Sequence, residues 1–148
     1  MGRILNGMEQ LHDQAPLDIV LAEDDPDLAA MHKRALEGDG HHVDVARDGA
    51  EAVAAVRDSD PDLLLLDMQM PRGDGFAVLE QLRGDANTVD QPVVVLSNAE
   101  LTDAEHHRLK RLGAIEFLAK WKINPRALVD WIRRWASSHT PRRARRRS

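Results

Sequence analysis

Five polar residues each stand at or near the end of a short apolar run. They are a pair of adjacent acids, a third acid further along the chain, a hydroxyl and an amine: Glu23, Asp24, Asp67, Ser97 and Lys120. Three carboxylates in one cleft repel one another and stay ionised only beside a cation. Oxygen ligands without histidine or cysteine select Mg²⁺, with Mn²⁺ or Ca²⁺ as alternatives. If these residues meet, they predict metal-assisted transfer of a phosphoryl group to a carboxylate, with the hydroxyl and the amine binding phosphoryl oxygens.

The elements that carry these residues alternate between strand-like and helix-like patterns. The predicted strands are 17–22, 43–46, 63–66, 92–96 and 114–119. The predicted helices are 26–37, 50–57, 76–83, 102–113 and 124–137. Several helix starts carry capping signals, among them Asp48, Asn124 and the capping box formed by Thr102 with Glu105.

Five strand–helix units with short loops predict an α/β fold with a parallel five-stranded sheet covered on both faces. The strand 63–66 is apolar at every position, which is typical of a strand in the middle of such a sheet. The expected architecture is a flavodoxin-like (βα)5 three-layer sandwich with strand order 2-1-3-4-5. In that order the carboxyl ends of the strands share one edge, so the five polar residues should converge there.

Composition sets the broad class of the protein. The 148 residues suit one domain, and 43% hydrophobic with 30% charged residues suit a globular chain. The absence of cysteine excludes disulfides, thiolate zinc sites and cysteine nucleophiles. No apolar run is long enough to cross a bilayer, so a membrane partner is not expected and a cytoplasmic location is the default.

The net charge of −5 hides an uneven distribution. Five arginines lie in the last seven residues, whereas residues 1–141 contain 15 basic and 25 acidic residues. We therefore expect an N-terminal extension at 1–15 that is flexible or a short helix, a domain at 16–137, and a disordered basic tail at 138–148.

Several sequence runs resemble the receiver domain of response regulators, the chemotaxis-Y-like family of two-component signalling. The runs are IVLAEDD at 19–25, RDGAEA at 47–52, PDLLLLDMQMP at 61–71 and DG at 74–75. Ser97 and Lys120 stand where the family has its hydroxyl and its lysine. The resemblance covers about residues 16–136, and the motifs occur in the family's order and spacing.

The resemblance implies a role for each matching residue. Asp67 is expected to be the phosphorylated aspartate. Glu23 and Asp24 are expected to bind Mg²⁺ together with Asp67, with Asp24 the more direct ligand. Gln69 is expected to give its backbone carbonyl to the metal. Asp25, next to the acid pair, is interpreted as a bystander.

Two further roles concern the phosphoryl group and the readout. Ser97 and Lys120 should bind phosphoryl oxygens, and Ser97 with Phe117 should form the conformational switch, although Phe117 suits a plain core position equally well. Two residues depart from the family pattern. Trp121 replaces the usual proline after the lysine, and Asn98 replaces a small residue after the hydroxyl.

The resemblance implies a single-domain response regulator that accepts phosphate from a histidine kinase or a phosphotransfer protein. It is not an enzyme beyond self-phosphotransfer and autodephosphorylation. No output domain fits after Ala136, so direct control of transcription and a nucleic-acid partner are not expected. A downstream protein should bind the face formed by helix 102–113, strand 114–119 and helix 124–137. Trp131 and Trp135 lie on the same side of the last of these helices. A homodimer through this face is a second option.

Other interpretations of the same residues stay open. The receiver fold could be an interaction module with idle chemistry, or an aspartyl-phosphate phosphatase, although Gln69 stands where such an enzyme needs a second acid. A flavin-binding module is a further alternative, but no hydroxyl-rich phosphate loop follows the first predicted strand of this chain. The histidine pairs His41–His42 and His106–His107 are expected to be solvated, and the two tryptophans could simply pack on the sheet.

Overall fold

The computed structural model describes residues 15–70, 75–97, 100–119, 123–139 and 141–142. Its strands are β1 (Asp18–Ala22), β2 (His42–Ala46), β3 (Leu63–Asp67), β4 (Val93–Ser97) and β5 (Glu116–Ala119). Its helices are α2 (Pro26–Gly38), α3 (Gly49–Ser59), α4 (Gly75–Arg83), α5 (Asp103–Arg111) and α6 (Pro125–Ala136). None of the helices in this described part is both long and apolar enough to cross a membrane.

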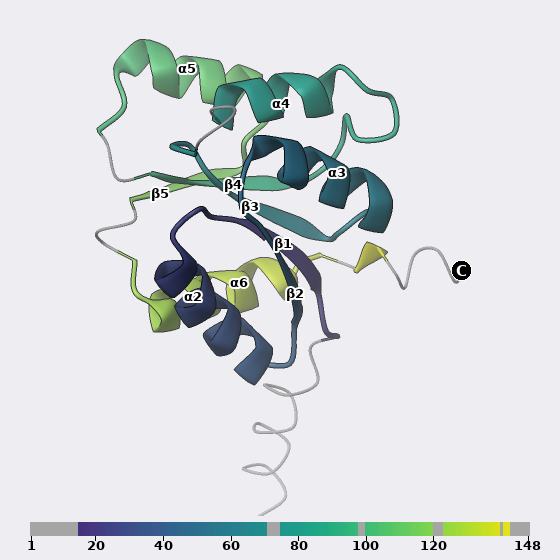
Figure 1. Ribbon diagram of the computed structural model, residues 1–148, viewed down its shortest axis with the longest axis vertical. Helices are drawn as coiled ribbons and strands as arrows, with labels where there is room; N and C mark the ends of the chain where they lie inside the picture. Colours follow the sequence, from purple (N-terminus) through teal and green to yellow (C-terminus); the bar gives the residue numbers. More distant parts are fainter. Residues whose placement is uncertain (1–14, 71–74, 98–99, 120–122, 140, 143–148) are drawn as a thin grey trace, which may run out of the picture.

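The five strands form one sheet in the order β2-β1-β3-β4-β5, and every neighbouring pair is parallel. Helices α2 and α6 cover one face of the sheet, and α3, α4 and α5 cover the other (Figure 1). The predicted three-layer architecture and strand order are therefore confirmed. Because parallel strands end at the same edge, the residues that follow β1, β3 and β4 are brought to one side of the domain.

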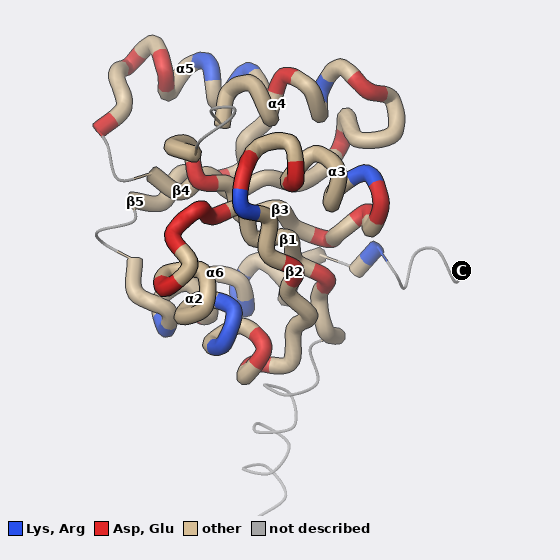
Figure 2. Tube along the Cα trace, in the orientation of Figure 1, with Lys and Arg blue, Asp and Glu red and all other residues tan. Residues whose placement is uncertain are grey.

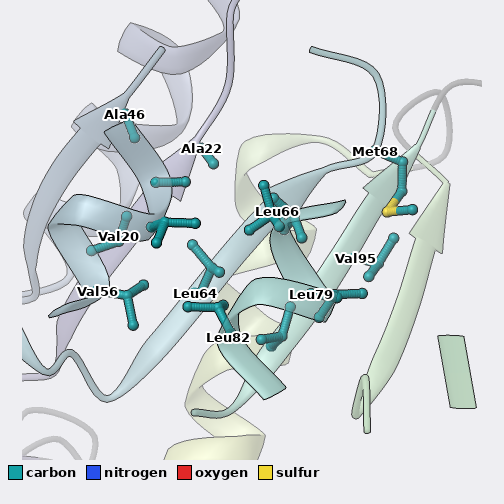
Figure 3. Packing of buried hydrophobic residues seen from close by; sticks show 14 of the residues in the cluster. Val20, Ala22, Ala46, Val56, Leu64, Leu66, Met68, Leu79, Leu82 and Val95 are labelled. Atoms are coloured by element: carbon teal, nitrogen blue, oxygen red, sulfur yellow. The ribbon is translucent and has the colours of Figure 1, made fainter. Parts of the chain in front are cut away.

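The central strands divide their side chains between two apolar clusters. Leu64 and Leu66 of β3 point toward α3 and α4, whereas Leu63 and Leu65 point toward α2 and α6. All four are fully buried, since successive side chains of a strand face opposite sides and both sides are covered here. Figure 3 shows side chains of the first cluster, among them Leu64, Leu66, Met68 and Val95.

Four of the five helices begin at a polar cap just after a strand. Asp25, Asp48 and Asn124 accept backbone N–H groups of the first turns of α2, α3 and α6. Thr102 and Glu105 form the predicted capping box at α5, with donor–acceptor distances of 3.1 and 3.0 Å. These caps satisfy N–H groups that the helix leaves unpaired, so they fix where each loop ends.

Three strands begin later than the sequence pattern predicts, and β1 does so by one residue, at Asp18. Pro92 has no N–H to donate to the ladder, and β4 begins at Val93. Ala114 donates its N–H to Leu109 O (3.1 Å), which closes the end of α5, and β5 begins at Glu116. Gly113 between them adopts φ +75, the left-handed conformation that commonly ends a helix.

The expectation of solvated histidines is wrong for His41. Its side chain is 3% exposed, and its Nδ1 accepts the N–H of Leu17 (3.1 Å). Its Nε2 lies 3.7 Å from the Asp39 carboxylate. The same carboxylate accepts from Nε of Arg133 on α6, at 3.1 Å to one oxygen and 2.9 Å to the other. His41 therefore ties the entry of β1 to the α2–α6 layer, while His42, His106 and His107 are exposed as predicted.

The burial of His41 predicts a pH-dependent stability. Desolvation lowers the pKa of His41 below its ordinary value of 6.5, and Arg133 lowers it further, whereas Asp39 and Asp62 raise it in part. Because the unfolded chain binds this proton more readily, stability is retained above pH 6.5 and is lost as the pH falls below it toward the folded-state pKa. Urea titrations should span about pH 7.5 to 5, roughly the range in which such a histidine titrates. We expect a steep loss of the unfolding free energy in wild type as the pH falls, and a weaker loss in His41→Gln. His42→Gln, at an exposed position, should keep the wild-type slope; equal slopes for all three proteins would contradict the prediction.

Candidate phosphoryl-acceptor site

The acids predicted to meet do so at the carboxyl edge of the sheet. Glu23, Asp24 and Asp67 each offer a carboxylate oxygen, and these oxygens all lie within 4.8 Å of one another. Glu23 and Asp67 are each 1% exposed, whereas Asp24 is exposed to solvent. In Figure 2 the acidic stretch after β1 runs in red toward the start of α2. Two buried acids and one exposed acid therefore share a small volume.

Strand register explains why the cluster forms. Ala22 of β1 pairs with Leu66 of β3, so the next residue along each strand is an acid of the cluster. The N–H of Glu23 donates to Ala46 O of β2 at 2.9 Å, which holds the backbone beyond the end of β1. Neighbouring strands lie about 4.8 Å apart, so this register alone brings the two buried carboxylates close together.

Asp25 is more than the bystander that the sequence suggested. Its carboxylate accepts the N–H groups of Asp27 (3.0 Å) and Leu28 (3.3 Å), so its side chain is turned into the first turn of α2. Its own N–H donates to Glu23 Oε2 at 3.1 Å. An aspartate directly before a proline at the first helical position is a cap signal, and this signal could have identified its role from the sequence.

The segment after Asp67 is held in place by short-range contacts. Gln69 donates its backbone N–H to Asp67 Oδ1 (3.0 Å), and Met68 donates its N–H to Leu96 O (2.9 Å). Gly75 packs so closely on Met68 that an added Cβ would lie 2.3 Å from its sulfur. A side chain at position 75 would therefore push on the segment that carries Asp67.

The hydroxyl and the aromatic residue lie on β4, which neighbours β3, and on β5, the edge strand beyond it. Ser97 is the last residue of β4 and is 1% exposed; it pairs with Ala119 at the end of β5. Phe117 is partly buried, packs against the apolar cluster below α4 and α5, and meets the exposed His106 ring edge-on at 5.1 Å. Lys120, which follows Ala119 directly, lies outside the described residues, as do Asn98 and Trp121.

Two recesses flank the acid cluster. One is lined by Glu23 and Asp24 together with the basic residues Lys33 of α2 and Arg47 after β2. The other is lined by Ser97, Gln69 and Phe76 among others. Nothing in the local sequence predicts Lys33 or Arg47 near these acids, because only the fold brings α2 and the end of β2 beside them.

The partner face predicted from the tryptophans is in part a packing surface. Trp131 and Trp135 are partly buried against the apolar cluster between α6 and the sheet, as the packing interpretation predicts. Their rings stack at 6.5 Å, and the His139 ring stacks on Trp135 at 4.3 Å. Partner binding at this face stays a prediction.

Comparison with known proteins agrees with this fold. The sequence profile of the response regulator receiver domain matches residues 19–133. The transcriptional regulatory protein CpxR of Klebsiella pneumoniae is 39% identical over 115 residues, which are 78% of this chain and 47% of CpxR. The chain thus spans about half the length of this curated relative.

Solved structures show the same architecture. Chemotaxis protein CheY4 of Vibrio cholerae superposes with a TM-score of 0.73 at 26% identity, covering 81% of this chain and 98% of CheY4. The receiver domain of the sensor histidine kinase PA1611 of Pseudomonas aeruginosa has a TM-score of 0.72 at 26% identity, covering 84% of this chain and all of that domain. Its structure contains a magnesium ion coordinated in the active site cleft.

A doubly wound sheet with an acidic cluster at its carboxyl edge defines a receiver-type protein. The chain belongs to the response regulator receiver domain family, whose members act in two-component signalling.

Proposed function

We propose that this chain is a phosphorylation switch whose acceptor is Asp67, acting as a single-domain response regulator. The observation that carries the proposal is the cluster of Glu23, Asp24 and Asp67 at the end of the central strand. Asp67 is buried but reaches the two other carboxylates, which is the arrangement expected of a nucleophile that works beside a bound cation.

The donor set of this cluster fits Mg²⁺. All three ligands are carboxylates, which hard divalent cations prefer, and the exposed side of Asp24 leaves room for retained water. Glu23, Asp24 and Asp67 would hold the ion, with the backbone carbonyl of Gln69 as a further ligand. When bound, Mg²⁺ neutralises the charge on the carboxylates and on the incoming phosphoryl group.

The chain's own residues supply the rest of the chemistry. An oxygen of the Asp67 carboxylate forms the new bond to phosphorus, while the phosphorus–nitrogen bond of a phosphohistidine breaks and the donor imidazole leaves with the electron pair. The Ser97 hydroxyl donates to a phosphoryl oxygen, and the Lys120 ammonium pairs with another. The donor is a histidine kinase or a phosphotransfer protein.

The readout is proposed to pass through Ser97 and Phe117 to the face formed by α5, β5 and α6. Phe117 lies on β5 two positions before Ala119, the register partner of Ser97, so movement of the hydroxyl toward a phosphoryl group can repack this strand. A downstream protein in the cytoplasm, or a second copy of the chain, would bind the repacked face.

Labelling of the full chain with acetyl phosphate tests the proposal. In Mg²⁺ we expect one acyl phosphate per chain, stable in acid and labile in base, and none after chelation by EDTA. Beryllofluoride should form a stable complex under the same conditions. Failure to form either adduct on folded protein would favour an interaction module with idle chemistry, and turnover of a generic phosphomonoester would favour a phosphatase.

Asp24→Asn tests the metal ligands. Two unit charges 4 Å apart interact by about 4 kcal/mol at an effective dielectric constant of 20, and exposure reduces this for Asp24, so we expect Mg²⁺ affinity to fall about tenfold or more. Titration calorimetry with Mg²⁺ measures the change. Asp25→Asn is the matched control, because its side chain caps α2 and lies outside the cluster; an equal loss in both variants would contradict the assignment.

A further inference from the structure

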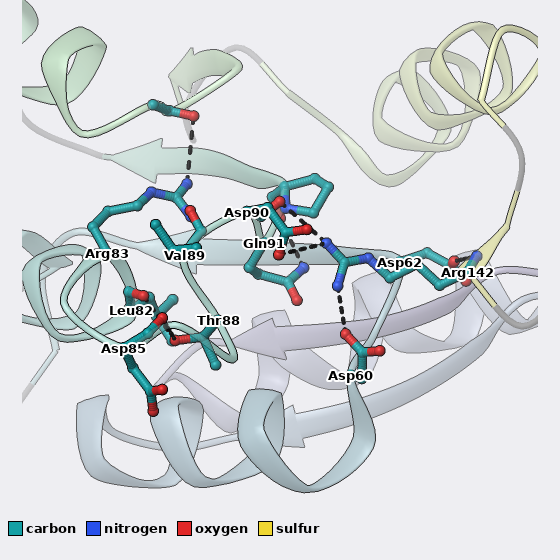
Figure 4. A network of polar contacts seen from close by, with 12 residues as sticks. Asp60, Asp62, Leu82, Arg83, Asp85, Thr88, Val89, Asp90, Gln91 and Arg142 are labelled. Atoms are coloured by element: carbon teal, nitrogen blue, oxygen red, sulfur yellow. Dashed lines mark hydrogen bonds and ion pairs between the residues drawn. The ribbon is translucent and has the colours of Figure 1, made fainter. Parts of the chain in front are cut away.

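The opposite edge of the sheet contains a second set of acids around one arginine. Asp60 and Asp62 precede β3, and Asp90 precedes β4, so all three lie at the amino ends of the strands. Arg142, from the basic tail, is the residue that they surround (Figure 4). We name Asp60, Asp62 and Asp90 the acidic notch.

Arg142 contacts each acid of the notch through a different group. Its Nη1 donates to the Asp60 carboxylate, and its backbone N–H donates to Asp62 Oδ1. Its Nη2 donates to the backbone carbonyl of Asp90 at 3.1 Å and lies 3.7 Å from the Asp90 carboxylate. Only 14% of its side chain is exposed, so the guanidinium is largely removed from water, which distinguishes it from an ordinary surface ion pair.

Two acids of the notch are positioned by contacts that do not involve Arg142. Asp62 is 4% exposed, and its second oxygen accepts the N–H of Asp18 at 2.7 Å, which ties it to the start of β1. Asp60 ends α3 in the left-handed conformation, with φ 46. A preformed site costs little ordering free energy when it is occupied.

The loop that carries Asp90 is fixed from the other side. Arg83 donates to Leu112 O (2.6 Å) and Val89 O (2.9 Å), and the buried Thr88 hydroxyl donates to Leu82 O (2.7 Å). These contacts hold Thr88 and Val89, the two residues that precede Asp90 (Figure 4). The carbonyl that accepts from Arg142 is therefore held in place by contacts that do not involve the tail.

We propose that the acidic notch is a guanidinium-binding site whose ligand is Arg142 of the same chain. The site requires arginine, because two amino groups of one planar fork must reach Asp60 and the Asp90 carbonyl together, which a lysine ammonium on a single stem does not reproduce. In this proposal Arg142 is ordered, in contrast to the expectation of a disordered tail from residue 138. The tail is anchored at the amino edge of the sheet, at the far end of β3 from Asp67.

Hydrogen–deuterium exchange on the full chain tests this site. Arg142→Ala keeps the backbone N–H but removes the guanidinium, and we expect the peptide containing residue 142 to exchange about tenfold faster and the melting temperature to fall. Arg142→Lys should restore little of either. Arg143→Ala is the matched control, and it should exchange as wild type.

Asp60→Asn tests the notch from the other side. Asparagine tolerates the left-handed conformation, so this variant removes the charge without straining the end of α3. It should accelerate exchange at residue 142 as Arg142→Ala does, and acyl phosphate formation at the opposite edge should stay at the wild-type level in both variants. Equal exchange in Arg142→Ala and Arg143→Ala would overturn the proposal. Protection of residue 142 that increased with protein concentration would also overturn it, because the arginine in the notch would then come from a second copy of the chain.

Discussion

Asparagine in place of Asp67 is expected to abolish the acyl phosphate completely. The amide has no anionic oxygen to attack phosphorus, but it has nearly the same shape and its oxygen can still accept the Gln69 N–H. Asp67 is 1% exposed, and asparagine fills the same buried space. The fold should therefore survive while phosphorylation is lost.

The same variant makes a second prediction about charge. Asp67 lies within 4.8 Å of two other carboxylate ligand atoms, and like charges at this distance repel one another. Without Mg²⁺ the melting temperature of Asp67→Asn should equal or exceed that of wild type. The increase that Mg²⁺ gives to wild type should be largely lost, because one of the three ligands is neutral.

Mass spectrometry after acetyl phosphate treatment and thermal unfolding with and without Mg²⁺ measure both effects. Asp58→Asn, at an exposed position of α3, removes one acid of the same kind and should leave both behaviours unchanged. Equal labelling of Asp67→Asn and wild type would show that another residue accepts the phosphate.

Leu65→Ala is expected to cause the largest loss of stability. Leu65 is fully buried in β3 and packs in the cluster between the sheet and helices α2 and α6. Its strand neighbours are Leu21 and Val94, which the backbone ladder holds in place, so the cavity cannot close easily. Truncation of a buried leucine costs about 2–5 kcal/mol, a large part of the roughly 5–15 kcal/mol that stabilises a typical domain.

Urea unfolding at pH 7.5, about one unit above the ordinary histidine pKa, separates this effect from the titration of His41. The midpoint should fall while the dependence of the unfolding free energy on urea stays the same. Met31→Ala removes a large apolar side chain that is 47% exposed on α2, and it should change stability by less than about 0.5 kcal/mol. Similar losses in both variants would mean that β3 does not carry the core as described.

The layers of the fold and the acid cluster at the sheet edge are predicted by short stretches of the sequence. The alternation of apolar strands with capped helices predicts the layers, because the apolar periodicity and the cap of each element lie within its own short stretch of sequence. Asp67 directly after four leucines and the Glu23–Asp24 pair after the first strand predict the acid cluster, since parallel strands bring their carboxyl ends to one edge. Two residues near the site, Asn98 and Trp121, depart from the family pattern.

The tertiary structure decided the contacts between residues far apart in the chain. His41 is buried because it accepts from Leu17, 24 residues earlier, and Asp39 binds Arg133 across 94 residues. Arg142 finds its acids 52 to 82 residues earlier. A histidine beside another histidine, or an arginine in a basic run, has the same local pattern whether solvated or buried. Only the packing of distant segments determines which of the two it becomes, because desolvation and ion pairing depend on what lies nearby in space.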